Sequence, residues 1–187
     1  TQENVGHRVL QRHYARLNEE TEKFLKQDPE TEKKLKQLDP GAAALTHYVQ
    51  RSGCYPVYEK TSVTYFPLGE DKFKEMLIQL EKAEHFIFLE YFIINQGEVW
   101  DHVLEILERK AKAGVEVRVM YDGMCALVSL PYRYPQQLRE RGIKAKMFSP
   151  IKPLLSTHQN NRDHRKIAVI DGRVAYNGGI NLADEYM

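Results

Sequence analysis

The sequence predicts an α/β protein in which a mixed β-sheet is flanked by helices on both faces and preceded by a helical arm. From residue 55 onward, strand-like and helix-like segments alternate, which is typical of a sheet covered by helices. Before that point, apolar residues recur at helical spacing on a charged background. A chain of 187 residues is long enough for one domain with a complete core and an attached arm. We therefore assign residues 1–54 to a helical arm or linker and residues 55–187 to the sheet domain.

Two helices are expected in the arm. Apolar side chains between residues 10 and 24 recur every seven residues, which gives one narrow apolar stripe, and Pro29 should interrupt this helix. Asp39 and Pro40 can cap and begin a second helix, and Gly53 can end it. We expect the arm to pack on the domain or on a neighbouring molecule.

The sheet domain is expected to alternate between strands and helices. Strands are predicted where short runs are rich in β-branched and aromatic residues, and helices where apolar residues recur three and four positions apart. Gly114 and Gly142 should end two of the helices. The expected elements are a strand at 63–66, a helix at 73–83, a strand at 86–93, a helix at 99–111, a strand at 115–121, a helix at 135–141 and a strand at 143–148.

A β-hairpin is expected near the end of the sequence. Residues 167–170 and 173–176 are two β-rich runs, and Asp171 and Gly172 between them favour the positive φ angles of a tight hairpin turn. Residues 149–163, which contain prolines and several polar side chains, should form a loop at the mouth of a site.

The segment around this hairpin carries side chains suited to an anion. His164 and Lys166 are two residues apart, so both would point to one face of a strand while Arg165 points away. Gly179 lets the backbone approach a ligand closely, and Asn181 can present its amide to the same volume. An imidazole, an ammonium and a carboxamide would therefore converge on one anion.

This grouping suits phosphoryl transfer without a metal. A neutral imidazole can attack phosphorus while fixed positive charge and amide donors stabilise the phosphoryl oxygens. A second imidazole can protonate the leaving alkoxide, because its ordinary pKa of about 6.5 lies near neutrality. The histidines that do not precede a lysine by two positions are His7, His13, His47, His85, His102 and His158. The partner half-site is therefore expected from another chain or from sequence outside these residues.

Composition excludes several other function classes. A net charge of +1 predicts no strong electrostatic capture of nucleic acid, which is not expected as a partner. No metal or other cofactor is expected, because neither a zinc-type ligand spacing nor a glycine-rich nucleotide loop is present. Cys54 and Cys125 fit two buried thiols in a reducing compartment, although the two could still pair. No run approaches the ~20 apolar residues of a membrane span, so these residues themselves should be soluble.

The pattern His-x-Lys-x4-Asp-x6-Gly-Gly-x-Asn, which ends at Asn181, resembles the motif of the phospholipase D superfamily and matches it at every fixed position. The resemblance extends to the bacterial cardiolipin synthases and covers roughly residues 55 to 187. It implies a phospholipase D-like α/β fold. The segments that carry this wider resemblance are 90–93, 114–119, 160–166 and 181–186.

The resemblance implies a transphosphatidylation. The phosphorus of one phosphatidylglycerol is attacked, a phosphohistidine forms, glycerol leaves, and a second phosphatidylglycerol takes the phosphatidyl group to give cardiolipin. It implies a catalytic set of His164, Lys166 and Asp171, and phosphate binding by Lys166, Gly179 and Asn181. At its Asp-Gly turn, Asp171 is expected to act chiefly through conformation or charge balance rather than by touching phosphate.

The resemblance also bears on the extent of the chain. Members carry two such motifs, called HKD motifs, in one chain, with membrane-spanning segments ahead of them. We therefore take residues 55–187 as the first catalytic half of a longer enzyme, truncated on both sides. That enzyme would act at the cell membrane surface on phosphatidylglycerol, and a second HKD half would complete its site.

Four further positions leave alternatives open. Glu90, inside an apolar strand, should pair with a cation or a histidine near the site, or form a plain core salt bridge. Glu185, like Asp184, could orient a histidine or lie in an exposed turn. Arg162 could meet the lipid phosphate or headgroup, or belong to a solvated loop. The segment 122–125 departs from the family pattern, so its role is open.

Three functions follow from these observations. The leading one is half of a cardiolipin synthase, with His164 as the nucleophile or as the paired acid. The second is a single-motif phosphodiesterase or nuclease that completes its site as a homodimer, because a two-fold axis would bring two copies of His164 together. The third is a non-catalytic piece that binds phosphate or phospholipid. A second His-x-Lys motif beyond Met187 would favour the first, and a natural chain end there would favour the second.

Overall fold

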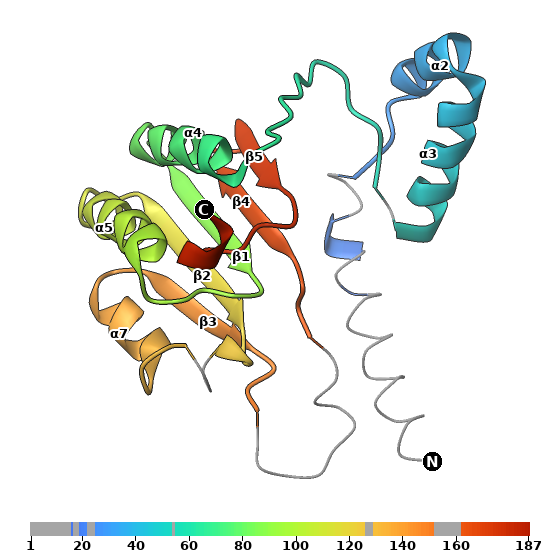
Figure 1. Ribbon diagram of the computed structural model, residues 1–187. Coiled ribbons are helices and arrows are strands. Elements are labelled where there is room, and N and C mark those ends of the chain that lie inside the picture. The colour runs from blue at the N-terminus through green and yellow to red at the C-terminus, as the bar shows by residue number, and fades with distance from the viewer. Residues whose placement is uncertain (1–15, 17–18, 22–24, 54, 126–128, 152–161) are drawn as a thin grey trace, which may run out of the picture. The chain divides into compact units, whose positions relative to one another are not determined.

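The computed structural model describes residues 16, 19–21, 25–53, 55–125, 129–151 and 162–187 (Figure 1). The chain divides into two compact units, Thr1–Thr64 and Tyr65–Met187. No helix in the described ranges is long and apolar enough to cross a membrane.

The first unit contains the helices α2 (Pro29–Leu38) and α3 (Pro40–Gly53). The side chain of Asp39 begins α3, because its Oδ1 accepts hydrogen bonds from two backbone N–H groups of the first turn at 2.9 and 3.0 Å. The predicted second helix is thereby confirmed. Most of the helix predicted between residues 10 and 24 lies outside the described residues, as does Cys54.

An extended segment follows α3. The side chain of Gln27 accepts a hydrogen bond from the backbone N–H of Val57 at 2.8 Å, which ties the start of this segment to the helical unit. The strand predicted at 63–66 is wrong: the segment is irregular, and Val63 is 88% exposed. Its β-branched and aromatic residues suit a strand, but strand propensity has no effect without a neighbouring strand to pair with.

The second unit holds a five-stranded sheet and its helices. The remaining predicted elements are all found, and their ends differ from the expected ones by a few residues. In chain order the elements are α4 (Gly69–Glu81), β1 (Phe86–Tyr91), α5 (Glu98–Lys112), β2 (Glu116–Asp122), α7 (Tyr134–Glu140), β3 (Lys144–Phe148), β4 (Lys166–Ile170), β5 (Val174–Asn177) and the short 3-10 helix η2 (Asp184–Tyr186).

The sheet is mixed, with strand order β3-β2-β1-β4-β5. Strands β1, β2 and β3 are parallel, whereas β4 runs antiparallel to both β1 and β5. Asp171 and Gly172 have φ angles of 53° and 63° and are the central residues of a tight turn, which the backbone N–H of Arg173 closes by donating to the carbonyl of Ile170 at 3.0 Å. The predicted hairpin and the mixed α/β class are both confirmed.

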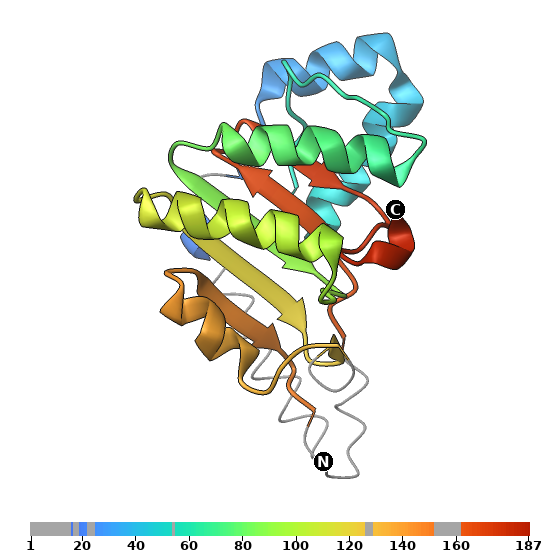
Figure 2. The ribbon, with the colours of Figure 1, turned by 60° about the vertical axis from the view of Figure 1, so that its left-hand side comes forward.

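Helices α4, α5 and α7 lie on one face of this sheet (Figures 1 and 2). Helix α5 connects β1 to β2, and α7 connects β2 to β3. Right-handed crossovers that move in one direction across a sheet place their helices on the same face. Within the described residues of this unit, the expectation of helices on both faces is therefore met on one face only. The opposite face carries half-buried side chains such as Phe88 and Met120.

The core fills the space between the helices and the sheet. Trp100 of α5 and Leu80 of α4 are fully buried together with Tyr91 of β1. The indole N–H of Trp100 donates a hydrogen bond to the hydroxyl of Tyr134. Burying one large apolar side chain stabilises a fold by about 1.5–3 kcal/mol, so this packing holds the carboxyl ends of β1 and β2 in place.

Candidate active site

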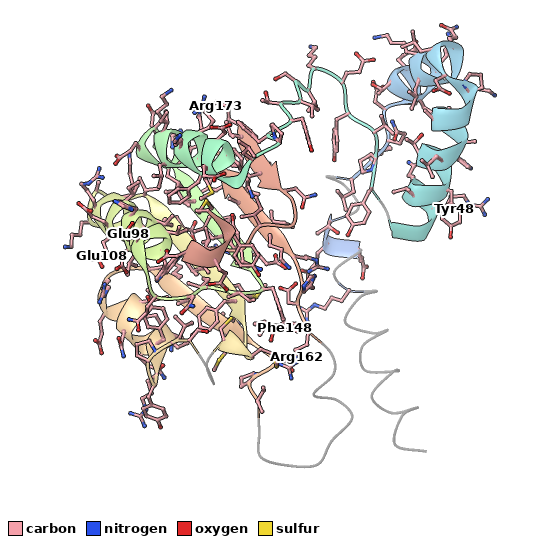
Figure 3. All side chains as sticks on the ribbon, in the orientation of Figure 1. Tyr48, Glu98, Glu108, Phe148, Arg162 and Arg173 are labelled. Atoms are coloured by element: carbon pink, nitrogen blue, oxygen red, sulfur yellow. The ribbon has the colours of Figure 1, made fainter. Side chains whose placement is uncertain are left out.

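His164, Lys166 and Asn181 lie where the carboxyl end of β1 meets the start of β4. Tyr91, the last residue of β1, pairs in register with Lys166, the first residue of β4. In Figure 3, two labelled residues lie at this end of the sheet: Phe148, the last residue of β3, and Arg162, which precedes β4. Ligands of open α/β sheets commonly bind outside the carboxyl ends of parallel strands, so the topology brings the motif to a favourable place.

His164 and Lys166 lie against the same aromatic ring. The centroids of the His164 and Phe92 rings are 4.7 Å apart, and Nζ of Lys166 lies 5.0 Å from the Phe92 centroid. Nζ of Lys166 also donates a hydrogen bond to the carbonyl of His164 at 2.7 Å. The imidazole and the ammonium are therefore on one side of the chain, as their two-residue spacing predicts.

The two groups differ in exposure. His164 is exposed, whereas Lys166 is only 3% exposed. Burial lowers the pKa of the Lys166 ammonium, and the nearby Asp163 carboxylate acts in the opposite direction. A buried cation that is bonded to one neutral carbonyl is poorly compensated. Such a site favours an anionic ligand beside an accessible imidazole.

Asn181 is buried and held in one orientation. Its Oδ1 accepts a hydrogen bond from the backbone N–H of Ile93 at 3.0 Å. The next residue, Leu182, forms an isolated parallel bridge to Ile94, which fixes the segment beside the end of β1. With Oδ1 occupied, the Nδ2 group of Asn181 is left to donate, and no acceptor for it is found in the described part of the chain. This geometry suits an oxyanion ligand.

The glycine pair borders open space. A Cβ built on Gly179 would meet no atom of the described chain within 4 Å. A Cβ on Gly178 would lie 4.0 Å from Nζ of Lys72. Packing within the protein therefore does not require glycine at position 179, and the clearance there is available to a ligand.

Asp171 lies away from the other motif residues. Its Oδ1 accepts the backbone N–H groups of His85 and Phe86 at 2.9 and 2.8 Å, and its Oδ2 accepts that of Glu84 at 2.9 Å. It follows β4, about 16 Å along the chain from Lys166 at 3.3 Å per residue. Figure 3 places the nearby Arg173 at the opposite end of the sheet from Arg162. This geometry agrees with the conformational role expected for Asp171, and its place in the catalytic set stays a prediction.

The fully buried Asp122 anchors the segment that enters β4. Its Oδ1 lies 3.1 Å from Nη1 of Arg162, and its Oδ2 accepts the backbone N–H of Asp163 at 2.9 Å. The guanidinium of Arg162 also donates to the carbonyl of Ser149. Arg162 is thus bound within the protein rather than presented to a headgroup. The segment that departs from the family pattern supplies, through Asp122, an anchor for the residues just ahead of His164.

Glu90 pairs with a cation beside the site, as one of the two sequence alternatives predicts. Its Oε1 lies 3.0 Å from Nη1 of Arg165. Burial raises the pKa of the Glu90 carboxyl, the neighbouring Asp163 carboxylate raises it further, and Arg165 acts in the opposite direction. This pair lies on the sheet face opposite Lys166, because Glu90 and Tyr91 are successive residues of one strand.

The acidic residues after Asn181 do not orient a histidine. The two carboxylate oxygens of Asp184 accept the backbone N–H groups of Glu98 and Val99 at 3.1 and 2.9 Å, so this side chain caps α5. A Cβ on Gly97 would lie 2.2 Å from Oδ2 of Asp184, so the cap requires glycine there. Glu185, expected as a supporting residue, is exposed and has no hydrogen-bond or ion-pair partner within the described ranges.

Sequence reasoning gave no site role to three residues that the structure brings to this site: Phe92, Asp122 and Lys72. Phe92 and Asp122 gave a positional signal, since each lies at the carboxyl end of a predicted strand. Lys72 could have been noticed from helical periodicity, because it shares the helical face of Met76 and Leu80, where an apolar residue is expected.

The site therefore presents an exposed imidazole, a buried ammonium and an oriented amide donor to one region. The ranges that the structure describes contain no group of three or more His, Cys, Asp or Glu residues placed to hold a metal ion. These groups can bind an oxyanion and attack it.

The mixed sheet and the complete motif at its edge define a phospholipase D-like domain. The family model described as "Cardiolipin synthase, PLD-like domain" matches residues 76–187. The chain belongs to this family.

Curated relatives cover most or all of the chain. A protein of Streptococcus mutans described as uncharacterized is 52% identical over 187 residues, which are 100% of this chain and 41% of the relative. A cardiolipin synthase of a Geobacillus species is 40% identical over 176 residues, which are 92% of this chain and 34% of the relative. The chain thus spans less than half the length of these relatives.

Among solved structures, NucT from Helicobacter pylori is similar, with a TM-score of 0.46 and 14% identity over 63% of this chain and 70% of that chain.

Proposed function

We propose that this chain is the first catalytic half of a phosphatidyltransferase that makes cardiolipin from two molecules of phosphatidylglycerol. The observation that carries the proposal is the joint contact of His164 and Lys166 with Phe92, beside the free amide donor of Asn181. Membership of the family gives the substrate class, because relatives are described as cardiolipin synthases.

The reaction proceeds in two displacements. An imidazole nitrogen of His164 attacks the phosphorus of one phosphatidylglycerol, and the bond from phosphorus to the glycerol oxygen breaks. The leaving glycerol takes a proton from a second imidazole, and a phosphohistidine is left. A hydroxyl of a second phosphatidylglycerol then gives its proton to that imidazole and attacks phosphorus. Cardiolipin forms and His164 is regenerated. If the second imidazole attacks first, His164 is the acid and the same steps apply with the roles exchanged.

The residues of this chain have distinct parts in these steps. Lys166 supplies a buried positive charge for the phosphoryl oxygens, and Nδ2 of Asn181 donates to one of them. Open space at Gly179 lets the phosphate approach the backbone. Asp171 acts indirectly by fixing the hairpin that carries Lys166.

The second imidazole comes from the other half of the enzyme. Within the described ranges, no other histidine makes a hydrogen bond or ring contact with His164, Lys166 or Asn181. His85 lies beside Asp171, at the far end of β4, and the ring of His102 contacts the carbonyl of Glu98 in α5. A second HKD motif, in the same chain or in a partner copy, completes the site. Because the substrate is a membrane lipid, the enzyme works at a membrane surface.

The test uses the full-length enzyme that contains this chain, with labelled phosphatidylglycerol in mixed micelles. Wild type should give cardiolipin and free glycerol, and rapid quenching should trap label on a histidine. His164→Ala should abolish cardiolipin formation, because it removes the nucleophile or the acid. His102→Ala is the matched control and should retain activity, since this exposed histidine lies in α5.

Two results would contradict the proposal. Unchanged turnover in the His164→Ala variant would show that His164 is neither the nucleophile nor the acid. Formation of phosphatidic acid alone, at every concentration of acceptor lipid, would make the protein a hydrolase rather than a transferase.

A further inference from the structure

Lys72 is largely buried, although no described residue supplies a compensating partner for its ammonium. It lies in the first turn of α4, on the face that also carries Met76 and Leu80, and it is 8% exposed. Two residues later, the side chain of Lys74 is 75% exposed. A buried ammonium is costly unless it is paired or bonded, so the position of Lys72 calls for a reason.

The surroundings of Lys72 are those of the candidate active site. Its Nζ lies 4.0 Å from the place of a Cβ on Gly178, the first glycine of the motif. Lys72 also lines a small cavity together with Tyr91 and Asn181, and Tyr91 pairs in register with Lys166. Within the described ranges, the buried lysines are Lys72 and Lys166, and both converge on this end of β1.

The ammonium of Lys72 has no partner among the residues that the structure describes. No carboxylate, carbonyl or hydroxyl of the described residues accepts a hydrogen bond from its Nζ. Two other lysines of this unit are bonded: Nζ of Lys110 donates to the carbonyl of Ala83, and that of Lys144 to Glu116. Burial lowers the pKa of Lys72. In the described part of the chain, two side-chain polar atoms are fully enclosed and have no hydrogen-bond partner: Tyr121 Oη and Asp163 Oδ2. Nζ of Lys72 also has no partner there but is not among these enclosed atoms. Nζ of Lys72 therefore keeps some access to solvent.

We propose that Lys72 is a second phosphate-binding cation of this site, approaching the phosphate from the side of Gly178. The inference rests on the proposed function for the identity of the phosphate, and it names a residue outside the stretch 76–187 matched by the family model. Lys72 and Lys166 contact different non-bridging oxygens of one phosphodiester, and Asn181 donates to that group as well. The missing partner of the Lys72 ammonium is the substrate, and the stability lost by burying it is recovered on binding.

The experiment compares Lys72→Met, Lys72→Arg and the control Lys74→Met in the full-length enzyme. Methionine keeps the apolar stem and removes the charge, so folding should be preserved and thermal stability should be unchanged or higher. Binding of inorganic tungstate, a phosphate analogue, should weaken about ten- to hundredfold, as for loss of one charged hydrogen bond. Lys72→Arg should retain part of the affinity, and Lys74→Met should match wild type.

A second measurement uses the unaltered protein and does not depend on how the variants fold. Reductive methylation, read by mass spectrometry, should modify Lys72 in free enzyme, because its Nζ keeps some access to solvent. Tungstate should protect Lys72 and leave the rate at Lys74 unchanged.

The outcomes separate this inference from the proposed function. Wild-type tungstate affinity in Lys72→Met, or equal methylation of Lys72 with and without tungstate, overturns the role of Lys72 even if cardiolipin is made. If tungstate binding depends on Lys72 but phosphatidylglycerol is not converted, the phosphate site stands and the proposed substrate fails.

Discussion

The carboxylate of Asp122 holds the main chain of Asp163: its Oδ2 accepts the backbone N–H of Asp163 at 2.9 Å, across 41 residues of sequence. This contact fixes the residue immediately before His164. The end of β2 therefore determines where the chain enters β4 and, with it, where the imidazole lies.

Asp122→Asn should lower both stability and activity. The change removes the charge that pairs with Arg162, and breaking a buried ion pair costs about 3–5 kcal/mol. Denaturant unfolding measures the loss, and turnover per folded molecule should fall because His164 is less well held. Asp71→Asn, at an exposed carboxylate of α4, should change stability by less than about 0.5 kcal/mol. Equal effects of the two substitutions would show that Asp122 is no anchor.

Asp171→Asn should destabilise the fold more than it impairs chemistry. One of the three backbone N–H groups loses its acceptor, and each bond loses the charge of the carboxylate, at a cost of about 1–3 kcal/mol. The folded variant should therefore keep most of its turnover at low temperature. Complete loss of turnover in a stably folded Asp171→Asn protein would show that Asp171 takes part in the chemistry itself.

The same carboxylate gives a pH dependence. Burial acts to raise the pKa of Asp171, but the backbone N–H groups of Phe86, Glu84 and His85 outweigh it and hold the pKa below the ordinary value of 3.8. Since the unfolded chain binds the proton more tightly, the stabilisation is present above that value and is lost as pH falls through the folded pKa. Unfolding measured from neutral to acid pH should show the stability difference between wild type and Asp171→Asn shrinking below pH 3.8.

Phe92→Leu should impair turnover while leaving the fold intact. Leucine keeps an apolar side chain but removes the ring that contacts both His164 and Lys166. A cation–π contact contributes about 0.5–2 kcal/mol, so kcat should fall roughly threefold to thirtyfold. Phe88→Leu is the matched control, because Phe88 meets Arg118 on the opposite face of the sheet. A similar loss of kcat in both variants would argue against a specific role of Phe92.

Asn181→Asp should separate the two functions of this side chain. An aspartate oxygen can still accept the backbone N–H of Ile93, so stability should stay within about 1 kcal/mol of wild type. The other oxygen replaces a donor with a negative charge facing the phosphate, and kcat/KM should fall sharply. Asn181→Ala should show the reverse balance, with lower stability from the unpaired N–H and a smaller loss of activity than His164→Ala. Full activity in Asn181→Asp would contradict the proposed role of the Asn181 amide as a hydrogen-bond donor to the phosphate.

Several elements were predictable because their causes are local. The hairpin follows from Asp171 and Gly172, whose tolerance of positive φ angles suits a tight turn. Helix α3 follows from a capping aspartate and a proline at its start. The predicted strand at 63–66 failed because a strand also needs a partner, and nothing in those residues specifies one.

The sequence by itself determined that His164 and Lys166 share a side, because the two-residue period of an extended backbone is a local property. Only the tertiary structure decided which other residues lie near that pair and which lie away from it. Asp171 is hydrogen-bonded to residues some 85 positions earlier in the chain, and Lys72 approaches the motif from helix α4. Such contacts depend on the strand order and on the face that the helices cover. These are set by how the whole core packs, which no short stretch of sequence contains.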